Sequence, residues 1–87
     1  MNGRALVAWN LRRIRTERGL SQERLADEAE VDRSYVGMLE REEASATVDI
    51  LDRLAFALQT EIAAFFVAPA EGSAKPKPLS AGRRAKT

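Results

Sequence analysis

The chain has 87 residues, a formal net charge of +1, and neither cysteine nor histidine. Without these two side chains, disulfides, thiolate or imidazole zinc sites and the usual nucleophile–base pairs are excluded. No glycine-rich phosphate loop accompanies the carboxylates, so the composition argues against an enzyme and predicts neither a metal nor a cofactor.

Charge is distributed unevenly along the chain. Residues 1–68 hold nine arginines and twelve acids, whereas residues 69–87 hold five basic residues and one acid. The second segment, PAEGSAKPKPLSAGRRAKT, also loses apolar periodicity and gains proline, glycine and serine. These changes predict one folded domain, residues 1–68, followed by a disordered basic tail, residues 69–87.

The apolar content does not predict a membrane protein. The longest apolar run, residues 62–68, is much shorter than the about 20 residues that span a bilayer. The beginning of the chain is rich in arginine and lacks the apolar core of a signal peptide. We therefore expect a cytoplasmic location.

Apolar residues recur at helical spacing almost throughout residues 1–68. Val7, Leu11 and Ile14 mark the stripe of a first helix, and Gly19 is a natural stop after it. Ser21 is a suitable N-cap for a second helix, SQERLADEA. The second helix is expected to bury Leu25, Ala26 and Ala29.

Three further helices are expected downstream. Asp32 is a suitable N-cap for the third, and either Ser45 or Thr47 for the fourth. Thr60 is a candidate cap for a short fifth helix, Glu61 to about Val67. No segment alternates with period two for long enough to form a strand, so the fold class is all-α with five short helices.

The connection between the second and third helices, around Glu30-Val31, is very short, which is typical of a helix-turn-helix. The chain resembles the Cro/C1-type (XRE) family of DNA-binding proteins in Leu20-Ser21-Gln22, Leu25-Ala26, Ala29, Val31, Ser34-Tyr35-Val36 and Leu39-Glu40. Within that family, DRSYVGMLER is particularly similar to the small controller proteins of restriction–modification systems. The resemblance covers about residues 11–66. It implies a compact, lambda-repressor-like five-helix domain that binds double-stranded DNA.

The face of the third helix opposite Val36 and Leu39 is expected to meet DNA, because a recognition helix inserts its N-terminal part into the major groove. The candidates for base contacts are Arg33, Ser34, Gly37 and Met38. Arg33 has the geometry to donate to guanine O6 and N7 together, or it pairs at the surface with Asp32 or Asp27. Met38 either meets a thymine methyl or completes the edge of the core.

Gly37 is unusual because glycine in a helix interior costs roughly 1 kcal/mol relative to alanine. Two explanations are open. A bare backbone would allow close approach of the helix to the groove, or it would allow close packing against another helix.

Phosphate contacts are expected from Ser21, Gln22, Tyr35, Arg41 and Arg12. The exposed N–H groups at the start of the second helix favour an anion near Ser21 and Gln22, although Ser21 could serve only as a cap. The resemblance implies that Gln22 holds a phosphate and also braces the recognition helix. Tyr35 would offer its ring to packing and its hydroxyl to a phosphate, whereas Arg41 and Arg12 could be merely solvated.

The resemblance also implies a structural ion pair between Arg15, on the first helix, and Glu40, at the end of the third. This chain departs from the family at Glu30, where a glycine is usual in a position that often needs positive φ. It departs again at Glu42 and Glu43, two acids in a loop normally close to the DNA backbone.

A homodimer is expected because one such domain covers only half a turn of DNA. The candidate interface residues, at the end of the fourth helix and in the fifth, are Leu58, Ile62, Phe65, Phe66 and Val67. Some of these must fill the domain's own core, and adjacent Phe65 and Phe66 cannot both point inward from so short a helix. Two-fold symmetry would predict a palindromic operator.

The favoured hypothesis is a sequence-specific transcriptional regulator that controls its own gene or a restriction–modification operon. As a DNA-bound protein it would be associated with the bacterial nucleoid. RNA polymerase is a further possible partner. The alternatives are an antitoxin whose C-terminal helix or tail covers a toxin protein, and a protein-interaction module that does not bind DNA. The basic tail either adds non-specific phosphate contacts or is only solvated.

Overall fold

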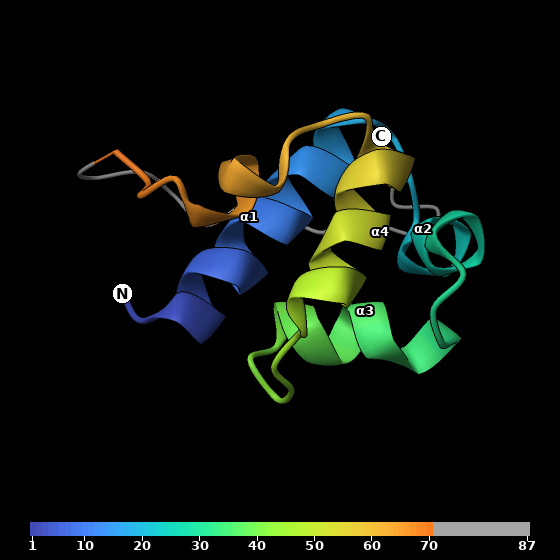
Figure 1. The fold of residues 1–87 in the computed structure, drawn as a ribbon, viewed down its shortest axis with the longest axis horizontal. Coiled ribbons are helices and arrows are strands. Elements are labelled where there is room, and N and C mark those ends of the chain that lie inside the picture. The colour runs from blue at the N-terminus through green and yellow to red at the C-terminus, as the bar shows by residue number, and fades with distance from the viewer. Residues whose placement is uncertain (71–87) are drawn as a thin grey trace, which may run out of the picture.

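The computed structural model describes residues 1–70 and is all-helical over that range (Figure 1). Its elements are α1 (Gly3–Glu17), α2 (Gln22–Ala29), α3 (Arg33–Glu40), α4 (Val48–Leu58) and the 3₁₀ helix η1 (Ile62–Phe66). The predicted all-α class is therefore confirmed. Residues 71–87, most of the predicted tail, lie outside the described residues.

Short polar side chains cap the α-helices as expected from their chemistry. Ser21 accepts from the backbone N–H of Arg24 at 3.0 Å, and Thr47 accepts from that of Ile50 at 3.1 Å. Asp32 caps α3. Each cap satisfies one backbone N–H that has no partner within its helix, so these three predicted starts are confirmed, with Thr47 in place of Ser45.

Left-handed residues end two of the helices. Glu30 follows α2 with φ 59° and ψ 44°, and Gln59 follows α4 with φ 57°. The turn after α2 thus keeps the positive φ for which glycine is usual, at a cost on the order of 1 kcal/mol for the glutamate. The carbonyl of Glu30 accepts from Nη1 of Arg53, on α4, at 3.4 Å, which helps to hold the turn.

The fifth helix differs from its prediction. It is a 3₁₀ helix preceded by Glu61 without a side-chain cap, so Thr60 is not its N-cap. Asn10, fully buried on α1, holds the segment instead: its Nδ2 lies 3.0 Å from the carbonyl oxygen of Phe65 and 2.9 Å from that of Val67. A tertiary contact, rather than a local cap, therefore fixes η1.

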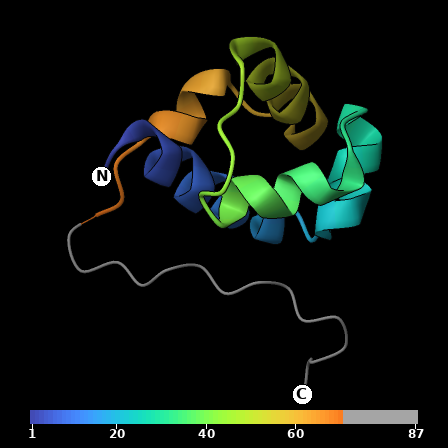
Figure 2. The same ribbon diagram turned by 90° about the horizontal axis from the view of Figure 1, so that it is seen from below.

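One hydrophobic core joins all five elements. Its fully covered members are Leu11, Leu25, Ala26, Val36, Leu54, Leu58 and Phe65. α3 packs against α1 and α2, and α2 also packs against α4. This packing leaves α3 along the lower edge of the molecule in Figure 1, and Figure 2, seen from below, shows it from its outer side.

None of the helices in residues 1–70 combines the length and apolarity needed to cross a membrane.

Candidate nucleic-acid interface

The α2–α3 pair is closed by a tight turn. At the end of α2 the N–H of Glu30 donates to the carbonyl of Asp27 at 3.3 Å, and the N–H of Val31 donates to that of Ala26 at 3.0 Å. Asp32 then caps α3 at once, so only three residues separate the two helices. The result is two eight-residue helices in sequence, the second with one side on the core and the other facing outward (Figure 2).

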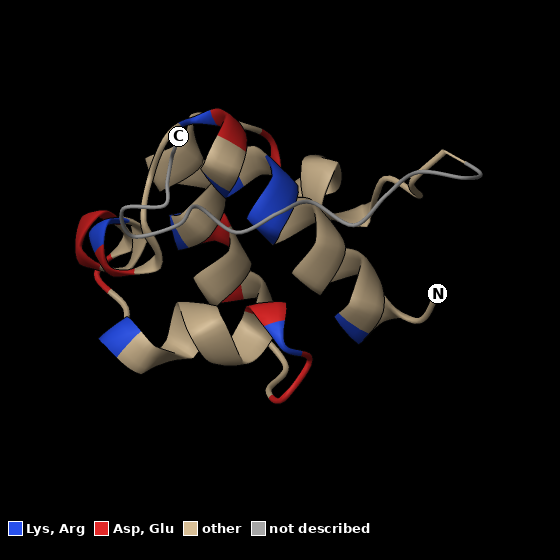
Figure 3. Cartoon of the chain, turned by 180° about the vertical axis from the view of Figure 1, so that it is seen from behind, with Lys and Arg blue, Asp and Glu red and all other residues tan. Residues whose placement is uncertain are grey.

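The outer face of α3, defined by Arg33, Ser34, Gly37, Met38 and Arg41, is uneven in exposure. The Arg33 side chain is 66% exposed, and its Nε lies 3.8 Å from an oxygen of Asp27, a loose surface pair. Met38 is half-buried. Charged residues occupy the two ends of α3 and leave its middle neutral (Figure 3). Of this face, Arg33 is the cation best placed to reach a ligand.

Ser34 is exposed but already engaged. Its hydroxyl and its backbone N–H both donate to Oδ2 of Asp32. These two hydrogen bonds lower the pKa of the Asp32 carboxyl, which therefore stays charged at neutral pH. A contact from Ser34 to a base would require its hydroxyl to accept a hydrogen bond or to turn away from Asp32.

Gly37 is buried and does not present a bare backbone to solvent. A Cβ at this position would lie 2.9 Å from Nη1 of Arg41 and 3.2 Å from Oε1 of Gln22. The glycine therefore makes room for two long polar side chains, one of them from α2. These neighbours agree with close packing, one of the two explanations for this glycine, while contact of Gly37 with a base stays a prediction that requires these side chains to move.

Glu40 is the centre of a buried polar group, the Glu40 cluster, formed with Arg15, Arg12 and Gln22. Arg15 donates from Nε to Oε2 at 2.6 Å and from Nη2 to Oε1 at 2.9 Å. Arg12 Nε and Gln22 Nε2 also donate to Oε1, at 3.1 and 3.0 Å. The geometry matches the expected ion pair between Arg15 and Glu40, which are 2% and 1% exposed. It ties α1, α2 and α3 together behind the outer face.

The electrostatics of the Glu40 cluster favour the charged carboxylate. Burial raises the pKa of Glu40, but the hydrogen bonds and charge of Arg15 lower it, as do the hydrogen bonds from Gln22 and Arg12. The net shift is downward from the ordinary value of 4.5. Because each oxygen of the carboxylate is hydrogen-bonded, the buried charge is compensated.

Four of the five expected phosphate contacts are engaged within the protein, and Gln22 is one of them through its hydrogen bond to Glu40. The Arg12 side chain is only 16% exposed and bonds Glu40, so it is not the merely solvated arginine that was the alternative to a phosphate contact. The Tyr35 hydroxyl donates to the carbonyl of Ser45 instead of pointing freely outward. Arg41 Nε lies 3.1 Å from an oxygen of Glu43. Ser21 keeps an exposed position at the start of α2.

The candidate interface residues divide into two groups. Leu58 and Phe65 are fully buried in the core, so they are not available to a second copy. Phe66 is 46% exposed and Val67 is 55% exposed, while Ile62 is half-buried. As expected, only one of the two adjacent phenylalanines points inward.

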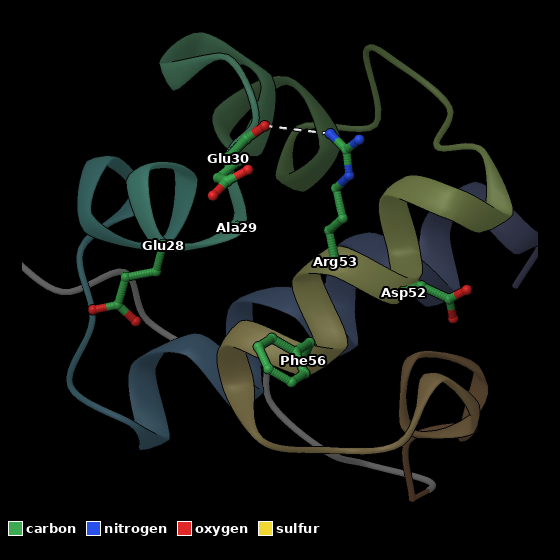
Figure 4. Close-up of a pocket in the computed structure, with 6 residues that line it drawn as sticks. All are labelled: Glu28, Ala29, Glu30, Asp52, Arg53 and Phe56. Atoms are coloured by element: carbon green, nitrogen blue, oxygen red, sulfur yellow. Dashed lines mark hydrogen bonds between the residues drawn. The ribbon is translucent and has the colours of Figure 1, made fainter.

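Sequence reasoning missed Phe56, whose side chain lies outside the core with 86% of the residue exposed. It borders a hollow of about 350 Å³ between the end of α2 and α4, together with Glu28, Ala29, Glu30, Asp52 and Arg53 (Figure 4). Its position about half a helical turn away from Leu54 and Leu58, on the opposite face of α4, was the available signal. The described residues include no group of three or more acids placed to hold a metal ion.

The fold and this site define a helix-turn-helix domain. Residues 11–65 match the HTH_3 helix-turn-helix family, and the chain belongs to that family, whose XRE-type members are DNA-binding transcription regulators. The resemblance noted from the sequence is thereby confirmed.

Individual relatives agree with the family. A hypothetical transcription factor of Neisseria meningitidis serogroup B is 38% identical over 55 residues, which are 63% of this chain and 52% of that protein, so the match spans about half of that relative. Control protein C.SmaI of Serratia marcescens is 39% identical over 62 residues, 71% of this chain and 74% of that protein. The crystal structure of the restriction–modification controller protein C.AhdI from Aeromonas hydrophila superimposes with a TM-score of 0.70 at 40% identity, covering 72% of this chain and 96% of that one.

Proposed function

We propose that this protein is a sequence-specific transcriptional regulator that inserts α3 into the major groove of its operator. The observation that carries the proposal is the exposed outer face of α3, held against α1 and α2 by the Glu40 cluster. A rigid helix with a polar outer side is the element that such proteins place in the groove. The likeness to two controller proteins supports a target in a restriction–modification operon.

Within the proposed complex, the residues have different tasks. Arg33 contacts a guanine with its planar fork, since it is 66% exposed and its surface pair with Asp27 is long. Ser34 and Met38 lie beside it for further base contacts. Ser21 and Gln22, at the start of α2, and Arg41, at the end of α3, approach phosphates and set the register without specifying sequence. Gln22 and Arg41 have partners in the free protein, as do Arg12 and Tyr35, so these four residues contribute by exchanging or sharing those partners.

We further propose a homodimer whose seam consists of Ile62, Phe66 and Val67. Phe66 in η1 and Val67 just after it are exposed, and Ile62 beside them is half-buried. Burying them against a second copy would remove this apolar surface from water. An isologous pair has two-fold symmetry, so the operator should be a palindrome with half-sites about 34 Å apart or a multiple of that distance.

Selection from a random pool of duplex DNA, followed by sequencing, tests the DNA-binding function. The expected result is enrichment of a palindrome that contains a guanine in each half-site. Absence of any enriched sequence, with binding that vanishes at moderate salt, would contradict the proposal and turn attention to a protein partner.

The dimer is tested by sedimentation equilibrium at tens of micromolar. Phe66→Asp is expected to shift the protein from dimer to monomer, because a carboxylate in an apolar seam is desolvated without a partner. Val48→Asp is the matched control, because Val48 is 66% exposed at the first position of α4, where an acid suits the helix dipole. A wild-type monomer, with and without operator DNA, would refute the seam.

A second candidate function, binding of a protein such as a toxin or RNA polymerase, has one specific observation in its favour. Phe56 is 86% exposed, so its apolar ring is available for burial against a partner. It borders the hollow whose lining includes the acids Glu28, Glu30 and Asp52. Phe56→Ser should then abolish capture of that protein while leaving operator affinity unchanged.

A further inference from the structure

We infer that Glu43 occupies the place of a DNA phosphate in the free protein and holds Arg41 back from the DNA, so that it sets operator affinity. The inference rests on the proposed function and concerns an acid that the DNA-binding role alone does not explain. Its basis is the geometry at the end of α3. There Arg41 pairs with Glu43, its guanidinium lies beside Gly37, and the neighbouring Glu42 forms no ion pair within residues 1–70.

The backbone after α3 folds the acid toward the arginine. Glu42 has a left-handed conformation, with φ 62°, which turns the chain back on the helix. The N–H of Glu43 then donates to the carbonyl of Met38 at 2.8 Å. This hydrogen bond places the Glu43 carboxylate against Arg41, with 3.1 Å between Oε2 and Nε.

Gly37 provides the room that this arrangement needs. Nη1 of Arg41 lies 2.9 Å from the point where a Cβ of residue 37 would be, closer than real Cβ atoms tolerate. The guanidinium therefore lies back along α3, over the outer face, rather than extending away from the helix. In this position it lies beside Gly37, in the middle of the outer face that α3 would present to the groove.

The two glutamates of the loop, Glu42 and Glu43, differ in whether they pair with Arg41. Both carry one negative charge near the phosphates of a bound duplex, so both should weaken binding by simple repulsion. Within residues 1–70, however, Glu43 forms the ion pair with Arg41, whereas Glu42 forms none. The hydrogen bond and charge of Glu43 also raise the pKa of Arg41.

This asymmetry separates restraint of Arg41 from general repulsion. To direct its Nε–H at a phosphate, Arg41 must exchange the carboxylate of Glu43 for it, and the pairing also fixes where its remaining N–H groups point. Replacing Glu43 removes both the repulsion and the competing partner, whereas replacing Glu42 removes only the repulsion. A dimer has two such sites, so the difference in binding free energy between the two variants should be doubled.

The experiment compares Glu43→Gln with Glu42→Gln for binding to the operator recovered by selection, at one salt concentration. Glu43→Gln is expected to bind roughly 3–10-fold more tightly than Glu42→Gln, in line with the modest strength of an exposed ion pair. The same two changes in an Arg41→Ala background should give equal affinities, because no arginine remains to be released.

A measurement without DNA checks the contact itself. By NMR, the Arg41 Nε–H should exchange with water faster in Glu43→Gln than in the wild type or in Glu42→Gln. Equal operator affinities for the two glutamate variants, or a difference that persists without Arg41, would overturn the inference. A wild-type protein that selects no operator at all would instead overturn the proposed function.

Discussion

Replacing Glu40 with alanine is expected to lower the free energy of unfolding by about 3–5 kcal/mol, the usual cost of stranding one half of a buried ion pair. Arg15 is 2% exposed and directs both Nε and Nη2 at this carboxylate. Arg12 and Gln22 lose the same acceptor. Small domains have a total stability of similar size, so the variant should be largely unfolded at 25 °C.

Urea titrations followed by circular dichroism, with sucrose added equally to all samples to keep the variant folded, provide the measurement. Glu28→Ala is the control, because Glu28 pairs with Arg24 at the surface and exposed pairs contribute less than about 1 kcal/mol. A loss for Glu40→Ala no larger than the loss for Glu28→Ala would contradict the structural role of the cluster.

The difference in unfolding free energy between the wild type and Glu40→Gln should depend on pH with a definite sign. Because the pKa of Glu40 is lower in the folded protein than in the unfolded chain, its stabilisation is present above the unfolded value and is lost as pH falls through the folded value. The unfolding free energy of the wild type should therefore exceed that of Glu40→Gln by a smaller amount as the pH falls below about 5. A gap between the two proteins that stays constant into acid would show that the carboxylate charge contributes nothing.

Asn10→Leu is expected to destabilise the domain by roughly 2–3 kcal/mol despite the similar size of the two side chains. The amide of Asn10 serves the carbonyls of Phe65 and Val67, and leucine would leave them without this donor. Since η1 has no side-chain cap, the segment should also loosen locally. Faster exchange of the Ala64 amide and faster proteolysis after Phe66 would report that loosening.

Asn2, the other asparagine of the chain, provides the comparison for this prediction. It is an exposed N-cap that accepts from the backbone N–H of Ala5 at 2.9 Å, and Asn2→Ala should cost only about 1 kcal/mol, without effect on η1. If Asn10→Leu leaves both stability and proteolysis unchanged, η1 is held by the burial of Phe65 alone.

Much of the fold follows from local chemistry that can be seen in the sequence. Ser21, Asp32 and Thr47 each precede a helix and have side chains that complete its first turn. The apolar spacing of residues such as Leu11 and Leu54 identifies the faces that form the core. The short α2–α3 connection was also predictable, and Glu30 takes the usual place of glycine there at a cost on the order of 1 kcal/mol.

The less predictable features depend on contacts between residues distant in the sequence. Asn10 looks like any polar helix residue until η1 folds across it, 55 residues later. Arg12 and Tyr35 looked free to meet phosphates, but they bond Glu40 and the carbonyl of Ser45. The space beside Gly37 is filled by the side chains of Gln22, on α2, and Arg41, just after α3. Such partners are chosen by tertiary packing, which periodicity and capping rules do not describe.

The central claim, that the outer face of α3 specifies the DNA sequence, is tested most directly by the affinities of Arg33→Ala and Arg24→Ala for the selected operator and for a scrambled duplex of equal length. The two arginine side chains are equally exposed, at 66%, and lie on neighbouring helices. Arg33→Ala should reduce the preference for the operator by about 1–3 kcal/mol per half-site and relax it at one guanine. Arg24→Ala should change both affinities by the same factor. Equal losses on the two duplexes for Arg33→Ala would contradict direct base contact by α3.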